Sequence, residues 1–210
     1  KLSDVRAIGQ VQFSQGIAVV RQPLTAAIAW NGEKITVERA TAQDLTASGV
    51  ISVNTTKSNL PEITDLNLNA QAKNYILQEL PLKLPNGIAL AGKVDFGGQI
   101  TGKLPEPNLI GEIRLRDLQV NQFAFDSVLT GNIESVRGRG FNLNVTGSKD
   151  RIALNLDANN RPNFFNVRWK DSVATGQAQG DNLTAKVDNF PLKILNLKTP
   201  ANTLIGTGAV

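Results

Sequence analysis

The sequence predicts an all-β fold, and three features of its 210 residues support this prediction. Apolar and polar residues alternate over short stretches, as they do in strands with one apolar face and one wet face. Turn-forming glycine, proline and asparagine recur about every eight to twelve residues between these stretches. No amphipathic helix of about ten residues or more is evident. We therefore expect a mostly antiparallel β-sheet.

Each expected strand is defined by apolar residues at alternate positions. Asn31-Gly32 predicts a hairpin between two of them, because a type I′ turn needs positive φ at both central residues. Residues 74–85 break the alternation and predict a helical turn or an irregular crossover. In chain order the defining residues are Val11 and Phe13; Ala26, Ile28 and Trp30; Ile35 and Val37; Ile51 and Val53; Leu66, Leu68, Ala70 and Ala72; Val94 and Phe96; Ile113 and Leu115; Phe123, Phe125, Leu129 and Ile133; Phe141, Leu143 and Val145; Ile152, Leu154 and Leu156; Phe165, Val167 and Trp169; and Leu183, Ala185 and Val187.

The composition argues against several classes of function. The net charge of +4 is scattered along the chain, without the basic stripe and interleaved aromatics of a nucleic-acid domain. The absence of Cys and His excludes Cys-containing zinc sites and mechanisms that need a His base or a Cys nucleophile. The carboxylates lie among polar residues and are expected to be solvated. We therefore expect no enzymatic activity, no cofactor and no metal.

The ends of the sequence and its hydropathy suggest a piece of a longer protein. The chain contains no Met, so we expect it to be a segment whose start codon lies elsewhere. It has no apolar run of about 18 residues, so any transmembrane anchor is expected outside it.

An internal repeat relates two parts of the chain at an offset of 115 residues. Residues 68–85 and 183–200 share eight identical pairs, where chance gives about one. We expect one continuous segment over residues 1–210, with a partial repeat unit at roughly 1–95 and a second at 96–210. Units that each expose an apolar face stack on their neighbours, which predicts an elongated fold.

The middle of the sequence resembles the repeat of TamB and its AsmA-like relatives. The segment Asn189-Phe190-Pro191-Leu192 also resembles an element that recurs in this family after a strand. The residues that carry the main resemblance are Gly92-Lys-Val-Asp-Phe96, Ile100-Thr-Gly102, Leu104-Pro105, Pro107-Asn108-Leu109, Gly111, Ile113, Leu115 and Val120. The resemblance extends to the cyanobacterial and plastid-envelope branch of the family.

The resemblance implies both a fold and a function. The implied fold is an elongated, curled sheet that is open along one side and apolar inside, called a β-taco. The implied setting is the periplasm or the plastid intermembrane space, in a protein anchored in the inner membrane. The implied partners are phospholipid acyl chains and a TamA-like outer-membrane barrel that contacts regions outside this segment. Unpaired sheet edges add the expectation of self-association.

The apolar stripes are the candidate functional feature, because they would line such a groove for phospholipid transport. The expected lining residues are Val94, Phe96, Ile113, Leu115, Phe123, Phe125, Leu143, Val145, Ile152, Leu154, Leu156, Phe165, Val167, Trp169, Leu183 and Val187.

Two alternatives remain open from the sequence. The same stripes would also suit the sealed core of a closed β-sandwich, as in an extracellular binding module. An open apolar face would equally suit a scaffold that holds unfolded outer-membrane strands by β-augmentation for assembly with a TamA-like barrel. Acyl chains and alternating strands need the same surface, so the pattern does not separate them.

Overall fold

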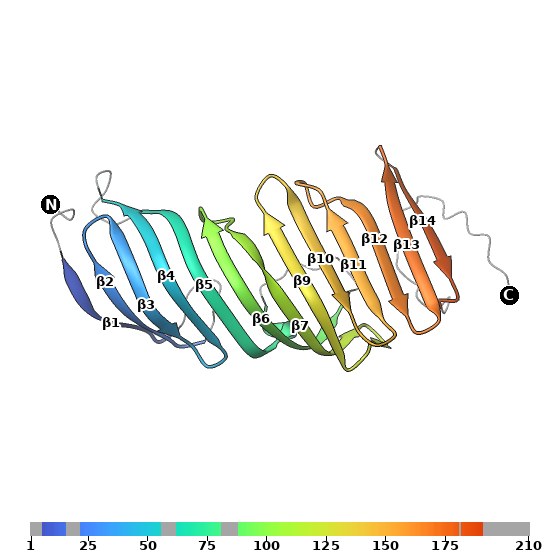
Figure 1. Cartoon of the computed structure of the whole chain (residues 1–210), viewed down its shortest axis with the longest axis horizontal. Coiled ribbons are helices and arrows are strands. Elements are labelled where there is room, and N and C mark those ends of the chain that lie inside the picture. Colours follow the sequence, from blue (N-terminus) through green and yellow to red (C-terminus); the bar gives the residue numbers. More distant parts are fainter. Residues whose placement is uncertain (1–5, 16–21, 56–61, 81–87, 181, 191–210) are drawn as a thin grey trace.

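The computed structural model describes residues 6–15, 22–55, 62–80, 88–180 and 182–190. These residues form a single 14-stranded sheet in which all pairings are antiparallel (Figure 1). The elements are β1 (Ala7–Phe13), β2 (Leu24–Trp30), β3 (Lys34–Thr41), β4 (Leu45–Asn54), β5 (Glu62–Ile76), the 3-10 turn η2 (Leu77–Glu79), β6 (Leu90–Gly102), β7 (Asn108–Val120), β8 (Phe123–Ala124), β9 (Val128–Val136), β10 (Gly140–Thr146), β11 (Arg151–Leu156), β12 (Pro162–Trp169), β13 (Ser172–Gln179) and β14 (Asn182–Asp188). The all-β, antiparallel prediction is confirmed.

The strands follow a meander, in which each one pairs with its neighbours in sequence. The short β8 is the exception, because it pairs only with β7 and lies off the path that joins β7 to β9. Figure 1 shows the strands side by side along the long axis of the molecule. Twelve spacings of about 4.8 Å make the sheet about 58 Å long. This length gives one face of the sheet a long continuous surface.

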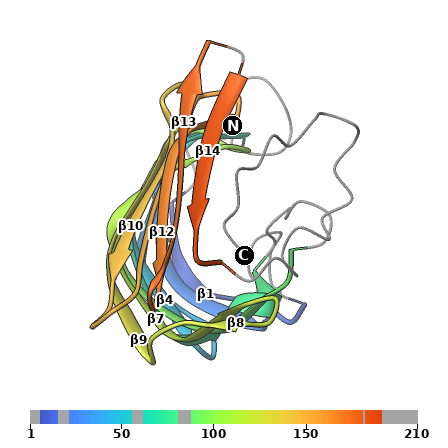
Figure 2. The ribbon, with the colours of Figure 1, turned by 90° about the vertical axis from the view of Figure 1, so that its right-hand side faces the viewer.

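The sheet is open and gently curved. Its two edge strands, β1 and β14, lie at opposite ends of the strand order, so the sheet does not close on itself. Viewed along the long axis, it forms a shallow arc with β8 on the inner side (Figure 2). The expectation of an open sheet is confirmed for the described residues, but the sheet is only gently curved and not strongly curled (Figure 2). The closed-sandwich alternative is also wrong for the described residues, because they form one sheet and not two.

One local prediction needs correction, and another is confirmed in part. The hairpin at Asn31-Gly32 forms, but only Gly32 has positive φ (94°), so the turn is not type I′. Instead the Asn31 side-chain oxygen accepts hydrogen bonds from the backbone N–H groups of Glu33 and Lys34, at 3.2 and 2.8 Å. In residues 74–85, the expected helical turn is present as η2, although β5 continues to Ile76 before it; residues 81–85 lie outside the described part of the chain. The sequence also predicts a strand at Ile17 and Val19, but residues 16–20 lie outside the described part, as do residues 191–200 of the repeat.

Candidate functional site

One face of the sheet is apolar along its whole length. Leu143 pairs with Leu154 and Leu154 with Phe165, and directly paired residues place their side chains on the same face. Following the pairing in both directions leads without interruption to β1 and β14. We call this surface the apolar face. On each strand of the main path it is represented, in order, by Val11, Ile28, Val37, Ile51, Leu68, Phe96, Ile113, Ile133, Leu143, Leu154, Phe165, Ala174 and Val187.

The pairing places fourteen of the sixteen expected lining residues on the apolar face. The other two, Phe123 and Phe125, come from β8 and the residue after it, and they pack against this face from its inner side. The fourteen are Val94, Phe96, Ile113, Leu115, Leu143, Val145, Ile152, Leu154, Leu156, Phe165, Val167, Trp169, Leu183 and Val187. Their role in lining a lipid path stays a prediction.

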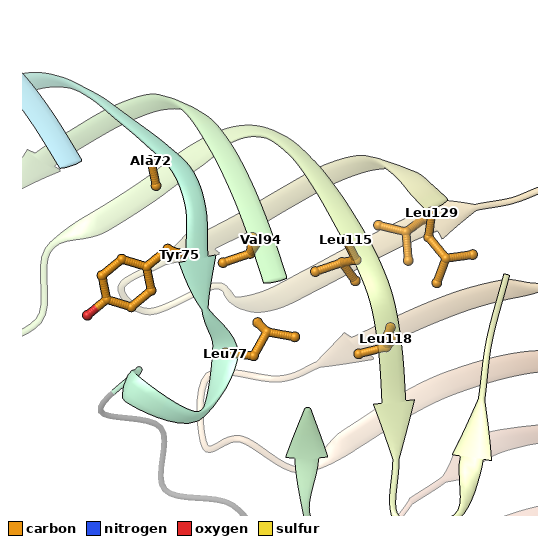
Figure 3. Close-up of a cluster of buried hydrophobic side chains, with 8 residues drawn as sticks. Ala72, Tyr75, Leu77, Val94, Leu115, Leu118 and Leu129 are labelled. Carbon is orange, nitrogen blue, oxygen red and sulfur yellow. The ribbon is translucent and has the colours of Figure 1, made fainter. Parts of the chain in front are cut away.

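The centre of the apolar face is covered at one end of its strands. Leu77 of η2 packs there against a cluster of buried residues (Figure 3). Leu129 and Val145 in this cluster are 0% exposed. By contrast, Leu183 and Val187 on β14 are 43% and 55% exposed. The face is thus sealed near the middle of the sheet and open toward its C-terminal edge.

Two β-bulges bring extra side chains onto this covered region. Asn74 in β5 and Asp117 in β7 have positive φ values of 56° and 50°. Each bulge adds one residue to its strand and so reverses the alternation beyond it. As a result Tyr75 and Leu118 lie with the apolar cluster, 3% and 4% exposed. Asn189, which the sequence repeat aligns with Asn74, has nearly the same φ of 57°. The repeat units themselves stay a prediction.

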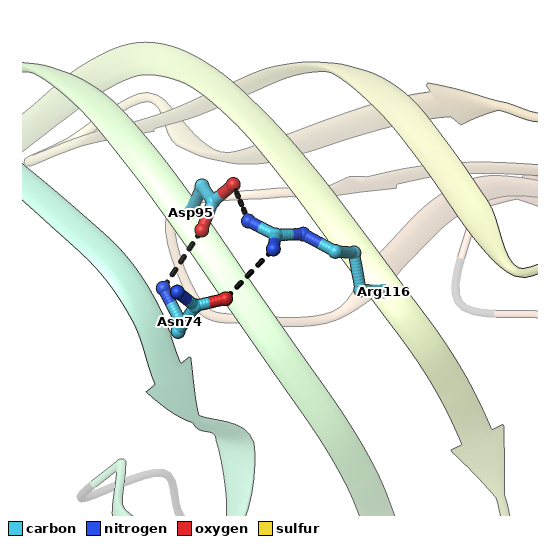
Figure 4. Close-up of polar contacts among 3 residues, drawn as sticks. All are labelled: Asn74, Asp95 and Arg116. Atoms are coloured by element: carbon cyan, nitrogen blue, oxygen red, sulfur yellow. Dashed lines mark hydrogen bonds and ion pairs between the residues drawn. The ribbon is translucent and has the colours of Figure 1, made fainter.

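A polar triad on the opposite face holds the first bulge in place (Figure 4). The backbone N–H of Asn74 donates to Asp95 Oδ1 at 2.8 Å, and Arg116 Nη1 donates to Asn74 Oδ1 at 2.7 Å. Arg116 Nη2 also donates to Asp95 Oδ2. Burial raises the pKa of Asp95, but the Asn74 N–H and the Arg116 guanidinium outweigh this effect, so the pKa lies below its ordinary value. The triad thereby fixes the point at which β5 leaves the sheet and crosses the apolar face.

We expect Asp95→Asn to destabilise the protein more at neutral pH than in acid. The side chains of Arg116 and Asp95 are 32% and 23% exposed, so solvent partly screens the ion pair. We therefore expect its loss to lower the free energy of unfolding by about 1 kcal/mol. A carboxylate whose folded pKa is lowered adds stability above its unfolded pKa of about 3.9 and loses it as the pH falls through the folded pKa. Urea unfolding should therefore separate the two proteins more at pH 7 than at pH 2. Asp65→Asn, an exposed change on β5, is the matched control, and an equal loss in both variants would contradict a role for the triad.

The segment after β7 is fastened to the inner side of the sheet by a second set of contacts. The ring of Phe123 lies 5.0 Å from that of Trp169 in an edge-to-face arrangement, and Trp169 Nε1 donates to the Ala124 carbonyl at 2.8 Å. Asp126 accepts the backbone N–H groups of Lys149 and Asp150, at 2.7 and 2.9 Å. The hydrogen bonds from Asp150 and Lys149 lower the pKa of Asp126. β8 is therefore held against the strands near β12.

In the N-terminal half, the apolar face carries a row of small side chains that crosses the strands. Each member is the direct partner of the next, from β2 to β7. Rows with larger side chains flank it on both sides, for example Leu68 and Ile100 on one side and Leu45 and Ile113 on the other. These flanking rows are four residues apart along the strands, which is about 13 Å. The small-residue row consists of Ala26, Ala40, Ala47, Ala70, Gly98 and Gly111.

An aromatic ring occupies one end of the small-residue row. Ring atoms of Phe96 lie 2.7 and 2.6 Å from the positions that Cβ atoms would take at Gly98 and Gly111. Only glycine leaves room for the ring to lie flat against the two strands. From Ala26 to Ala70 the row is therefore a shallow trough along the long axis of the sheet, and the Phe96 ring covers its last two members, Gly98 and Gly111.

Sequence reasoning left the N-terminal half of the apolar face out of the expected lining. The sequence shows the alternation of these strands. Extending the rule that alternate residues share a face back to Val11 would have added the N-terminal half to the expected lining. Leu118 and Tyr75 could not be assigned in this way, because the bulges at Asp117 and Asn74 break the alternation. Leu77 was hidden for a different reason, since it reaches the cluster from η2 and not from a strand.

Two features are absent from the residues that the structure describes. Nowhere among them do three or more His, Cys, Asp or Glu side chains gather closely enough to hold a metal ion. In the same part of the chain, no helix is both long and apolar enough to cross a membrane. The chain matches no protein-family model, no curated protein and no solved structure.

Proposed function

We propose that this chain is a non-enzymatic segment of a TamB-like protein whose apolar face carries phospholipid acyl chains across the space between two membranes. The observation that carries the proposal is the continuity of that face over all strands of the main path. A 16-carbon tail loses about 13 kcal/mol of favourable burial when it enters water, at about 0.8 kcal/mol per methylene. A carrier must therefore surround the tail with apolar side chains in place of the membrane interior at every step. A continuous apolar face does this without any chemical reaction.

The shape of the sheet suits a path along its long axis. The small-residue row crosses β2 to β7 in that direction, with larger apolar side chains on both sides. The opposite face is polar, so the sheet can remain in water while its apolar face holds a tail. We propose that the gently curved sheet forms the wall of a β-taco groove in the complete protein, with lipid head groups at the open side.

The covered region at the centre narrows the proposed path. Tyr75, Leu77 and Leu129 are buried where η2 crosses the face, so acyl chains have no access to that end of the strands. Ala70 and Leu143 belong to one row of paired residues, which lies away from this cover, and both are half-buried. A tail that moves along the sheet would therefore follow this row.

The remaining parts of the proposal rest on the family resemblance. They are a periplasmic or plastid intermembrane location, an inner-membrane anchor outside this segment, and an outer-membrane TamA-like barrel as partner. A second candidate function is a scaffold for unfolded outer-membrane strands. It is favoured by β1 and β14, which end the sheet and whose outer edges pair with no described strand.

Site-specific photo-crosslinking in the full-length protein tests the proposal. Crosslinkers at Ala70 and Leu143 on the apolar face should capture phospholipid, identified by mass spectrometry. Those at the next residues, Gln71 and Asn144, project from the opposite face and should capture several-fold less. Equal capture from both faces would reject the lipid path. Capture of outer-membrane proteins alone would replace it with the scaffold function.

A further inference from the structure

The polar face of the C-terminal strands has an unusual charge pattern. Strands β10, β11, β12 and β13 contain no Asp or Glu, although they contain arginines. On β5 to β7, by contrast, acidic and basic residues such as Asp95 and Arg116 are mixed and pair with each other. Within the described chain, the polar face of β10 to β13 therefore presents uncompensated positive charge.

Two arginines lie directly opposite each other in this region. Arg151 of β11 pairs with Arg168 of β12, so their side chains leave the same face with Cβ atoms about 5 Å apart. Like charges at directly opposed positions destabilise a sheet unless an anion lies between them. Arg151 Nη2 donates only to Asn144 Oδ1, at 3.4 Å, and neither arginine pairs with a carboxylate of the described residues. The nearest acid along this row, Asp188 on β14, is 3.1 Å from Lys186.

A shallow hollow extends across β10 to β14, lined by Arg151 but not by its partner Arg168. Its floor includes Ala153, which is 6% exposed, and its walls carry amide and hydroxyl groups with Arg151 and Lys186 as the only charged residues. Phe164 also borders it and is 40% exposed, which is high for a phenylalanine. The hollow thus combines cations, neutral hydrogen-bonding groups and one accessible aromatic ring.

The amides beside the hollow are already held in fixed orientations. Asn155 Nδ2 donates to Asn142 Oδ1, and Asn163 Nδ2 donates to Asn155 Oδ1 at 2.7 Å. Because each amide has more than one donor and acceptor, the chain of three keeps free groups for a ligand. Pre-oriented groups lose less conformational entropy when they bind.

We infer that this polar face binds an acidic polysaccharide. The paired guanidinium groups fit a carboxylate or phosphate group through charge-assisted hydrogen bonds. The amides and hydroxyls fit sugar hydroxyls, and Phe164 offers an apolar ring surface to the face of a sugar. A shallow, open surface suits an extended polymer better than a small molecule, which needs an enclosing pocket. A single aromatic ring does not provide the successive stacking platforms of a single-stranded nucleic-acid site.

Affinity electrophoresis or calorimetry with three polymers tests this inference. The probes are polygalacturonate as the acidic sugar polymer, dextran as the neutral one, and polyphosphate as an acidic polymer without sugar. We expect the protein to bind polygalacturonate and not dextran. The double variant Arg151→Gln, Arg168→Gln should weaken this binding at least tenfold. Arg39→Gln, on the polar face of β3, is the matched control and should leave it unchanged.

A second variant separates sugar recognition from simple attraction of a polyanion. Phe164→Ala keeps every charge, so it should weaken binding of polygalacturonate several-fold and leave any binding of polyphosphate unaltered. Circular dichroism of each variant checks the fold, which we expect to persist because the changed side chains lie on the exposed polar face. Absence of polygalacturonate binding would overturn the inference. So would retention of full affinity by the double arginine variant, or equal effects of Phe164→Ala on both acidic polymers.

Discussion

Leu129→Asp is expected to unfold the centre of the sheet. Leu129 is 0% exposed and packs in the cluster with Leu115 and Val145 beneath η2. An aspartate there would lose the burial of the leucine side chain and place an unpaired carboxylate out of water, at a cost of about 5 kcal/mol or more. Since the whole stability of a domain is about 5–15 kcal/mol, the folded state should be lost or close to it. Circular dichroism and urea unfolding measure the effect.

Leu154→Asp is the matched control on the same face. Leu154 is only half-buried, so its replacement leaves the new carboxylate in contact with water. The expected loss is about 1–2 kcal/mol, from the apolar area that the leucine no longer covers. In the full-length protein this variant should fold and yet reduce lipid capture at Leu143, its direct partner. Similar destabilisation by the two substitutions would contradict the distinction between a covered centre and an open face.

The sequence predicted most of the strands and the side of the sheet on which their residues lie, but it missed β13 and joined β8 and β9 into one strand. Alternation with a period of two is a local property, and the pairing of Leu143, Leu154 and Phe165 follows it without exception. Whether the apolar side meets a second sheet is a tertiary property that alternation does not encode. For this reason the sequence left the closed sandwich open, and the degree of curvature could be inferred only from a resemblance.

Within single strands, the sequence did not predict the bulges or the face on which the side chains after them lie. At Asn74 and Asp117 one added residue turns the following side chains to the other face. The sequence shows a break in alternation at residues 74–85, and a turn or crossover is the ordinary reading of such a break. The structure has such a turn at η2, but it first continues β5 through the bulge to Ile76, because Asp95 on β6 and Arg116 on β7 satisfy the polar groups of Asn74. That contact joins residues far apart in the sequence, so no local pattern reveals it.

The small-residue row was missed for a related reason. Alanine and glycine do not stand out as apolar positions in a sequence pattern. Their alignment across six strands therefore becomes apparent only when the pairing of the strands is known. Once aligned, they lie between rows that contain Leu68 and Ile113, and they leave the apolar face low from β2 to β5, where no Phe96 ring covers them. The apolar face thus depends on small residues for its depth as much as on large ones for its hydrophobicity.

The final prediction concerns a glycine on this face where two strands approach closely. Gly131 of β9 faces Val145 of β10, and a Cβ at Gly131 would overlap the carbonyl oxygen of Asn144. That oxygen belongs to the backbone, so the clash cannot be relieved by a change of rotamer. Gly131→Ala must therefore push β10 away or shift the register. We expect a loss of about 3 kcal/mol from overpacking and weakened backbone hydrogen bonds.

Gly9→Ala provides the matched comparison, because it is the same substitution on the same face of β1. A Cβ at Gly9 would meet nothing within 4 Å. There the lower entropy of the unfolded chain should dominate, so the change should be neutral or stabilising by up to about 1 kcal/mol. Urea unfolding gives the two stabilities, and amide hydrogen exchange should show faster exchange in β9 and β10 of Gly131→Ala alone. If the two variants are equally stable, β9 and β10 do not approach each other at Gly131 as closely as described here, and the packing of the apolar face at its centre is looser.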